Sequence, residues 1–223
     1  MTRIREFLAI WSLALAVTTA GAAQAQPAQI QIADGPIPVR VLAQGPADTT
    51  TDLQAICLFR SDPANTLHGS LAEMNDKLKG LLVRIRTQQL FRGELGETLL
   101  IAPQKGTIPA KRLLLIGLGD SETFTLQRME LVGSILYREA GRLGVAHPFF
   151  APTLLDGGVS KYTTGAAAEQ VLRGFLRGAA TEKALPEANA TAGTAVQDLT
   201  YLAGPQHASD TRDGIEKAFA AAK

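Results

Sequence analysis

The sequence contains few of the residues from which covalent and metal chemistry is usually built. Its 223 residues include one cysteine and three histidines. A single cysteine cannot form an internal disulfide, and Cys57 lies in the apolar run Ala55–Phe59, which favours a buried side chain over a nucleophile. His68, His147 and His207 are far apart, have no liganding neighbour in the sequence and form no His-Glu-x-x-His motif. We therefore predict no metal site.

The net charge of the chain is also close to zero. The chain has 22 lysines and arginines against 21 aspartates and glutamates, a formal net charge of +1. Nucleic-acid binding depends on clustered basic side chains that neutralise phosphates, so we predict no nucleic-acid partner. Hydrophobic residues make up 46% of the chain and charged residues 19%, a composition typical of a folded domain.

Long hydrophobic runs are missing except at the N-terminus. Arg3 and Arg5 precede the apolar run Phe7–Val17, and a small-x-small site follows that ends at Ala25. This is the pattern of a secretory signal peptide, and we predict that the first 25 residues are cleaved off before Gln26. The run is shorter than the ~20 residues that span a bilayer, although an uncleaved anchor is the alternative. We expect a periplasmic or secreted protein without stable membrane insertion after cleavage.

After a flexible lead-in at residues 26–36, strand and helix patterns alternate through a domain predicted at residues 37–223. Strands are predicted at Val39–Leu42, Gln54–Phe59, Glu97–Ala102, Arg112–Gly117, His147–Ala151 and Asp198–Ala203. Helices are predicted at Ser70–Ile85, Leu126–Leu143, Ala166–Ala180 and Thr211–Ala222, the first opened by a capping box of Ser70 and Glu73. This order predicts an α/β fold with a mixed β-sheet of about five to six strands flanked by helices.

Motifs for hydrolysis or nucleotide binding are missing. The sequence has no Gly-x-Ser-x-Gly elbow and no phosphate-binding loop of the Gly-x-x-x-x-Gly-Lys-Ser/Thr type. The strongest local feature is Gly117-Leu-Gly119-Asp120, where a strand ends before a helix. A tight turn is the favoured interpretation. The alternative is that backbone amides at Gly117 and Gly119, with a second loop at Gly157-Gly158, approach a small ligand.

Two segments carry a family resemblance. Phe91–Leu100, followed by Ala110–Gly119, resembles the N-terminal domain of the leucyl (cytosol) aminopeptidase family, and the helices expected after them are similar in place and length. The resemblance covers residues 38–222. It implies a macro-domain-like three-layer sandwich.

The resemblance also implies where catalysis belongs. In the family, a separate C-terminal domain binds two metal ions that activate water, and no segment like its Asn-Thr-Asp-Ala-Glu-Gly-Arg motif stands in this sequence. We therefore assign no catalytic residue, no metal ligand and no cofactor. We expect an exported, non-catalytic binding, assembly or regulatory module, whose partner is itself or a full-length aminopeptidase.

Two alternatives remain open at this point. One is a macro-domain-like binder of a nucleotide or ADP-ribose, which would use Gly117, Gly119, Asp120 and the loop Asp156–Gly158. The other is a metallo-aminopeptidase role, either by family membership or as one half of a split enzyme.

Overall fold

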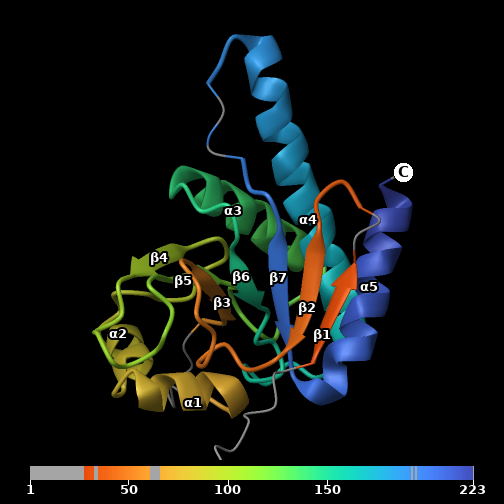
Figure 1. Ribbon diagram of the computed structural model, residues 1–223. Coiled ribbons are helices and arrows are strands. Elements are labelled where there is room, and N and C mark those ends of the chain that lie inside the picture. Colours follow the sequence, from red (N-terminus) through yellow and green to blue (C-terminus); the bar gives the residue numbers. More distant parts are fainter. Residues whose placement is uncertain (1–27, 33–34, 61–65, 192, 194, 223) are drawn as a thin grey trace, which may run out of the picture.

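The computed structural model describes residues 28–32, 35–60, 66–191, 193 and 195–222, and these form three layers around a seven-stranded sheet (Figure 1). The strands are β1 (Gln29–Ile32), β2 (Val39–Ala43), β3 (Gln54–Leu58), β4 (Thr98–Ile101), β5 (Leu113–Gly117), β6 (Phe149–Ala151) and β7 (Leu199–Ala203). Their order is β1-β2-β7-β6-β3-β5-β4. The five inner strands are parallel, whereas β1 and β4 run antiparallel at the two edges. The predicted mixed α/β sheet is confirmed, with more strands than the five to six expected.

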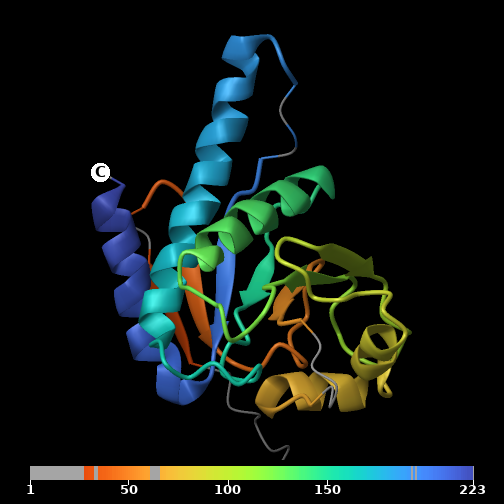
Figure 2. The ribbon, with the colours of Figure 1, turned by 180° about the vertical axis from the view of Figure 1, so that it is seen from behind.

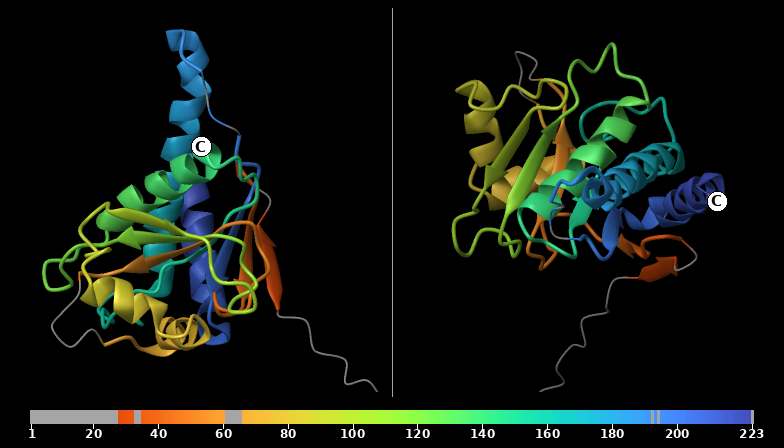
Figure 3. Two further views of the ribbon diagram at one scale, coloured as in Figure 1. Left: turned by 90° about the vertical axis from the view of Figure 1, so that its left-hand side faces the viewer. Right: turned by 90° about the horizontal axis from the view of Figure 1, so that it is seen from above.

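Helices cover both faces of this sheet. They are α1 (Gly69–Lys77), α2 (Leu81–Thr87), α3 (Arg128–Arg142), α4 (Thr164–Ala184) and α5 (Ala208–Ala221), with the short 3-10 turns η1 (Leu185–Ala188) and η2 (Pro205–His207). Helices α3, α4 and α5 lie side by side on one face, and α1 and α2 lie on the other (Figures 2 and 3). The C-terminal end of α4 projects beyond the body (Figure 1). Within the described part of the chain, none of these helices has the length and apolarity needed to cross a bilayer.

The central strand β3 explains why there are two apolar cores. Ala55 and Cys57 face the core under α3, α4 and α5, whereas Ile56 and Leu58 face the core under α1 and α2. All five residues of β3 are buried. A parallel strand with helices over both faces has no solvated side, which accounts for the continuous apolar run seen in the sequence.

The N-terminal edge strand β1 was not predicted. The segment 26–36 was expected as a flexible lead-in, and this is wrong for Gln29–Ile32, which pairs antiparallel with β2. Four residues that alternate glutamine and isoleucine give only a weak strand signal. The partner strand supplies the backbone hydrogen bonds that make the pairing stable.

The single helix predicted over 70–85 is two helices. The chain breaks after α1 because Lys79 and Gly80 adopt left-handed conformations, with φ of 55° and 77°. The predicted capping box is also wrong, because His68 occupies the N-cap position and makes no side-chain cap. The hydroxyl of Ser70 donates to the carboxylate of Asp156 instead, so a tertiary contact replaces the local one.

The predicted signal peptide, with its cleavage site between Ala25 and Gln26, lies outside the described residues. It stays a prediction.

Candidate functional site

A large cavity lies at the carboxyl ends of three parallel strands. It has a volume of about 380 Å³ and is lined by segments that follow β2, β6 and β7, together with the first turns of α1 and α4 and one residue of α5. The N-terminal ends of α4 and α5 meet at this edge, on the lower side of the molecule in Figure 1. Open α/β sheets bind ligands outside the carboxyl ends of their strands. The polar or ionisable side chains of the lining are those of Gln44, Ser70, Thr153, Asp156, Tyr162, Thr163, Thr164, Gln206, His207 and Thr211.

Asp156 occupies one wall of this cavity. It follows β6, and its carboxylate accepts a hydrogen bond from the hydroxyl of Ser70 in the first turn of α1. A Cβ atom added to Gly69 would overlap the same carboxylate. A carboxylate is favourable at a helix N-terminus because the free amides there carry partial positive charge. Asp156 therefore places a negative charge where α1 begins.

A second carboxylate stands at the start of α4. Asp210 of α5 accepts hydrogen bonds from the backbone N–H of Gly165 at 2.6 Å and from the hydroxyl of Thr164 at 2.8 Å. The Gly165 hydrogen bond lowers the pKa of Asp210 below its ordinary value. Thr163 caps the same helix, since its side-chain oxygen accepts from the N–H of Ala166 at 3.1 Å. The N–H groups of Gly165 and Ala166 in the first turn of α4 are thus already satisfied by the protein.

One buried hydroxyl in the lining of the cavity, that of Thr211, is unsatisfied within the described part of the chain. Thr211 of α5 lines the cavity and is fully buried, and its hydroxyl has no hydrogen-bond partner among the residues that the structure describes. A buried polar atom without a partner costs free energy. Such an atom at the wall of a cavity can be satisfied by a ligand.

Cys57 is not available for chemistry next to this cavity. Its side chain is fully buried in β3, and burial raises the pKa of the thiol. The neighbouring Thr153 lines the cavity, and its hydroxyl bonds both the N–H and the carbonyl of Cys57. The sequence interpretation of Cys57 as a small buried hydrophobe is confirmed.

The strand-end residues Gly117, Gly119 and Asp120 lie away from this cavity. The N–H groups of Gly117 and Gly119 donate to the carbonyls of Glu97 and Gly93, both at 2.8 Å. A Cβ atom on Gly117 would overlap the carbonyl of Glu94, and Gly119 has a φ of 75°. Glycines are needed here because the loop before β4 packs closely against the end of β5. This geometry favours the tight turn over a cradle for a ligand.

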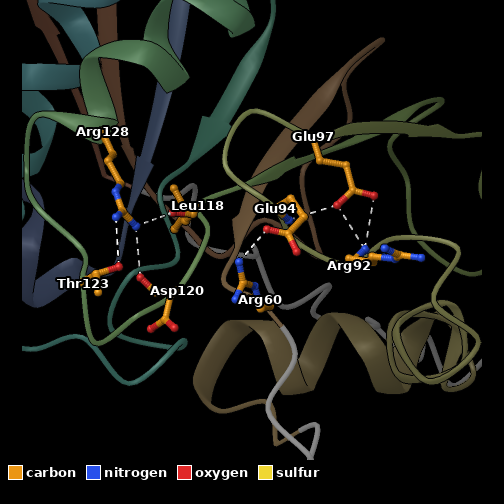
Figure 4. A network of polar contacts seen from close by, with 8 residues as sticks. All are labelled: Arg60, Arg92, Glu94, Glu97, Leu118, Asp120, Thr123 and Arg128. Carbon is orange, nitrogen blue, oxygen red and sulfur yellow. Dashed lines mark hydrogen bonds and ion pairs between the residues drawn. The ribbon is translucent and has the colours of Figure 1, made fainter.

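A network of polar contacts holds that loop in place (Figure 4). The carboxylate of Glu97 accepts from the backbone N–H groups of Arg92 and Glu94 at 3.0–3.2 Å. Glu94 in turn pairs with Arg60 at 2.7 Å.

Arg128 of α3 fixes the other side of the turn. It donates to the carbonyls of Leu118 and Asp120 and to the hydroxyl of Thr123, at 3.0–3.1 Å (Figure 4). The carboxylate of Asp120 accepts from the N–H of Glu122. These polar groups all have partners within the protein.

Gly157 and Gly158 also lie outside the lining of the large cavity. Their N–H groups donate to carbonyls within the same turn, those of Thr153, Leu154 and Leu155. Gly157 lines a separate hollow of about 60 Å³. Of the loop Asp156–Gly158, only Asp156 reaches the large cavity.

The structure thus brings together residues that sequence reasoning missed. Ser70, Thr163, Thr164 and Thr211 come from three helices that are far apart in the chain. A signal was available for Thr163, which precedes an alanine-rich helix as an N-cap residue does. No local pattern marks Thr211, because its role depends on how α5 packs.

The histidines do not form a metal site in the described residues, where no group of three or more metal-ligating side chains is found. His147 nevertheless has a neighbour that the sequence did not indicate, since its Nδ1 lies 2.7 Å from Asp198. Asp198 also pairs with Arg40 at 3.0 Å. His207 lines the large cavity, and His68 stands at the start of α1.

Comparison with known proteins gives the class of this domain. The family model described as "Cytosol aminopeptidase family, N-terminal domain" matches residues 55–179. The chain therefore belongs to the cytosol aminopeptidase family, and the matching part is its N-terminal domain.

Individual relatives agree with this assignment. A "Probable cytosol aminopeptidase" of Thermosynechococcus vestitus is 33% identical over 106 residues, which are 45% of this chain and 21% of that protein. Another, of Roseiflexus castenholzii, is 29% identical over 186 residues, which are 83% of this chain and 34% of that protein. The matching part of the chain spans between 13% and 34% of the length of these and similar curated relatives.

Solved structures share the fold. A tomato leucine aminopeptidase mutant superposes with a TM-score of 0.60 at 19% identity, over 86% of this chain and 37% of that one. An Oceanobacillus iheyensis macrodomain with MES bound gives a TM-score of 0.56 at 13% identity, over 85% of this chain and 96% of that one. The predicted macro-domain-like architecture is confirmed.

Proposed function

We propose that this chain is a non-catalytic aminopeptidase N-terminal domain that binds a small ligand and regulates or assembles with an aminopeptidase. Peptide hydrolysis, in this proposal, is the work of another part of the aminopeptidase. The observation that carries the binding role is the cavity of about 380 Å³ at the carboxyl ends of β2, β6 and β7. Its size is within the ~300–1,000 Å³ typical of small-molecule sites.

The proposal is supported by which polar groups still have an unused capacity to form hydrogen bonds. At the turn next to the segments that carry the family resemblance, Glu97 and Arg128 already bond backbone groups of the protein. The cavity, in contrast, contains the unpartnered hydroxyl of Thr211. Ligand-binding capacity therefore lies in the cavity.

Two experiments test the two parts of this function. The binding part is tested by amide chemical shifts of the purified protein during titration with small molecules of different charge. Residues after β2, β6 and β7 should shift, and a panel that leaves them unmoved would remove the binding role. The assembly part is tested by co-purification with a full-length aminopeptidase, and recovery of unbound chain alone would count against a partner.

A nucleotide or ADP-ribose is the second candidate ligand. It is favoured by the shared macrodomain fold, because structures of that Oceanobacillus iheyensis macrodomain are named with ADP and with ADPR bound. The amides at Gly117 and Gly119 already have backbone partners, so such a ligand would have to use the cavity near Asp156. The same titration, with ADP-ribose as the probe, tests this candidate.

An enzymatic role as one half of a split aminopeptidase is tested by hydrolysis. We expect no release of product from a leucine anilide by the purified chain with manganese or zinc added. Metal-dependent turnover would replace the binding role with a catalytic one.

We also propose export, supported by Arg3, Arg5 and the apolar run Phe7–Val17. The chain has a single tryptophan, Trp11, within that run. The exported protein should therefore begin at Gln26 and show no tryptophan emission. Intact mass and fluorescence of the protein recovered from the periplasm test both, and retained tryptophan emission would show that cleavage does not occur.

A further inference from the structure

We propose that the large cavity binds a small organic cation, a primary ammonium on an apolar body, and not a phosphate-bearing ligand. This inference rests on the proposed binding function and names the chemical class of its ligand.

The charges at the cavity are the first argument. Its described lining residues include no lysine or arginine, and the acidic side chain among them is that of Asp156. Asp210 adds a second carboxylate behind the lining, next to Thr164. Phosphate sites are built from basic side chains and free amides, so the wall has the wrong sign for a phosphate and the right sign for an ammonium.

The helix N-termini are the second argument. A phosphate at an α/β sheet edge is usually held by the free amides of a helix start. Here the N–H of Gly165 donates to Asp210 and the N–H of Ala166 donates to Thr163, and the carboxylate of Asp156 lies against the start of α1. A phosphate at the start of α4 would have to displace the protein's own oxygens, and it would meet the carboxylates of Asp156 and Asp210.

The unpartnered hydroxyl of Thr211 is the third argument. It is fully buried and lines the cavity. Its oxygen can accept a hydrogen bond from an ammonium N–H, which has donors only. Asp156 would supply the charge-assisted partner, and the pair would hold the ammonium head.

Apolar side chains supply the surface for the rest of the ligand. Leu154, Leu155 and Ala167 line the cavity together with the ring of Tyr162. A short branched alkyl chain fits this mixture of aliphatic and aromatic surface.

Three probes separate the cation from its alternatives. Isoamylamine is a cation at pH 7, because alkylammonium groups such as that of lysine titrate near ~10.4. Isoamyl alcohol has the same carbon skeleton without the charge, and ADP-ribose is an anion. We expect saturable amide shifts around the cavity with isoamylamine at millimolar concentration, at least about tenfold weaker binding of the alcohol, and no shifts with ADP-ribose.

Two variants test the residues. Asp156→Asn should weaken isoamylamine binding about tenfold, because the charge is lost and the size kept. Thr211→Val should also weaken it while preserving the shape of the side chain. The matched control is Thr200→Val, since Thr200 of β7 is likewise buried with an unpartnered hydroxyl but does not line the cavity. Thr200→Val should bind isoamylamine as the wild type does.

The outcomes distinguish this inference from the proposed function. Cation-selective binding that weakens in Asp156→Asn and Thr211→Val supports both. Binding of ADP-ribose at the cavity in preference to isoamylamine overturns the inference that the ligand is a cation, whereas the proposed binding function is retained. Equal binding of the amine and the alcohol, or an unchanged Asp156→Asn, overturns the role of charge. If the cavity residues respond to none of the three probes, both the preference for a cation and the proposed binding function are overturned.

Discussion

The carboxyl edge of the sheet has two halves that differ in how their polar groups are used. Over β3 and β5, the loop before β4 closes the edge, and the amides of Gly117, Leu118 and Gly119 all donate to backbone carbonyls. Over β2, β6 and β7 the edge stays open as a cavity with the buried, unpartnered hydroxyl of Thr211. The segments that carry the family resemblance belong to the closed half.

This difference separates evidence for the fold from evidence for function. Glu97 and Arg128 organise a turn, and their side chains bond groups of the protein itself. A motif can therefore identify the family and still say little about the ligand. The open half carries weak sequence signals, yet it is the half with room and unsatisfied bonding capacity.

The largest expected effect comes from breaking the closed half at Gly117. In Gly117→Ala the added Cβ atom would overlap the backbone carbonyl of Glu94, which cannot move without disturbing the pairing of β4 with β5. We expect a loss of about 3 kcal/mol in the free energy of unfolding, measured by urea denaturation.

Gly106→Ala is the control for Gly117→Ala. Gly106 has a φ of 82° but no atom near its added Cβ, so only the conformational cost of about 1 kcal/mol applies. Equal losses in the two variants would show that the close approach at Gly117 contributes nothing.

Glu97→Ala should have the next largest effect. Its carboxylate holds the N–H groups of Arg92 and Glu94, and hydrogen bonds to a charged group contribute about 2 kcal/mol. Glu94→Ala, which removes a half-exposed ion pair with Arg60, should cost less than about 1 kcal/mol. Thermal melts of the two variants give the comparison, and a reversed order would contradict this account of the closed half.

The sequence predicted the closed half better than the open half for a physical reason. The strand Gln54–Leu58 is continuously apolar because it is buried on both faces, and Gly117 and Gly119 mark the end of β5. Patterns of this kind are local. The cavity, in contrast, is assembled from segments between Gln44 and Thr211, and no local rule places them together.

The helix break shows the same limit at a smaller scale. Leu71, Leu78 and Ile85 have helical spacing in one stripe and are buried, yet the chain turns at Lys79 and Gly80. The hydroxyl of Ser70 donates to the carboxylate of Asp156, 86 residues later, instead of capping its own helix. Spacing predicted which side chains are buried, and tertiary contacts decided where the helices begin and end.

Asp210→Asn tests the open half through pH. Because the hydrogen bond from Gly165 lowers the pKa of Asp210 below 3.8, its ionised form stabilises the native state above the unfolded pKa of about 3.9. This stabilisation is lost as the pH falls through the lower folded value. We expect Asp210→Asn to cost up to about 1 kcal/mol at pH 7, and less at pH 3.

Asp213→Asn is the matched control on the same helix. Asp213 pairs with its neighbour Arg212 at the surface, and exposed pairs contribute little. Denaturation at both pH values should show almost no difference from the wild type for Asp213→Asn. A gap between wild type and Asp210→Asn that widens toward pH 3 would mean that the carboxylate does not stabilise the start of α4.

The smallest effect on stability is expected at Thr211, which is the sharpest contrast with the closed half. Its hydroxyl has no partner in the described ranges of the chain, so Thr211→Val should leave the free energy of unfolding within about 0.5 kcal/mol of the wild type, or raise it. Thr49→Val should cost about 1–2 kcal/mol, because the equally buried hydroxyl of Thr49 bonds Gln54 at 2.9 Å. Urea denaturation of both variants without ligand measures this difference. A large loss in Thr211→Val would mean that the hydroxyl is already satisfied within the fold, and the open half would then hold no bonding capacity in reserve for a ligand.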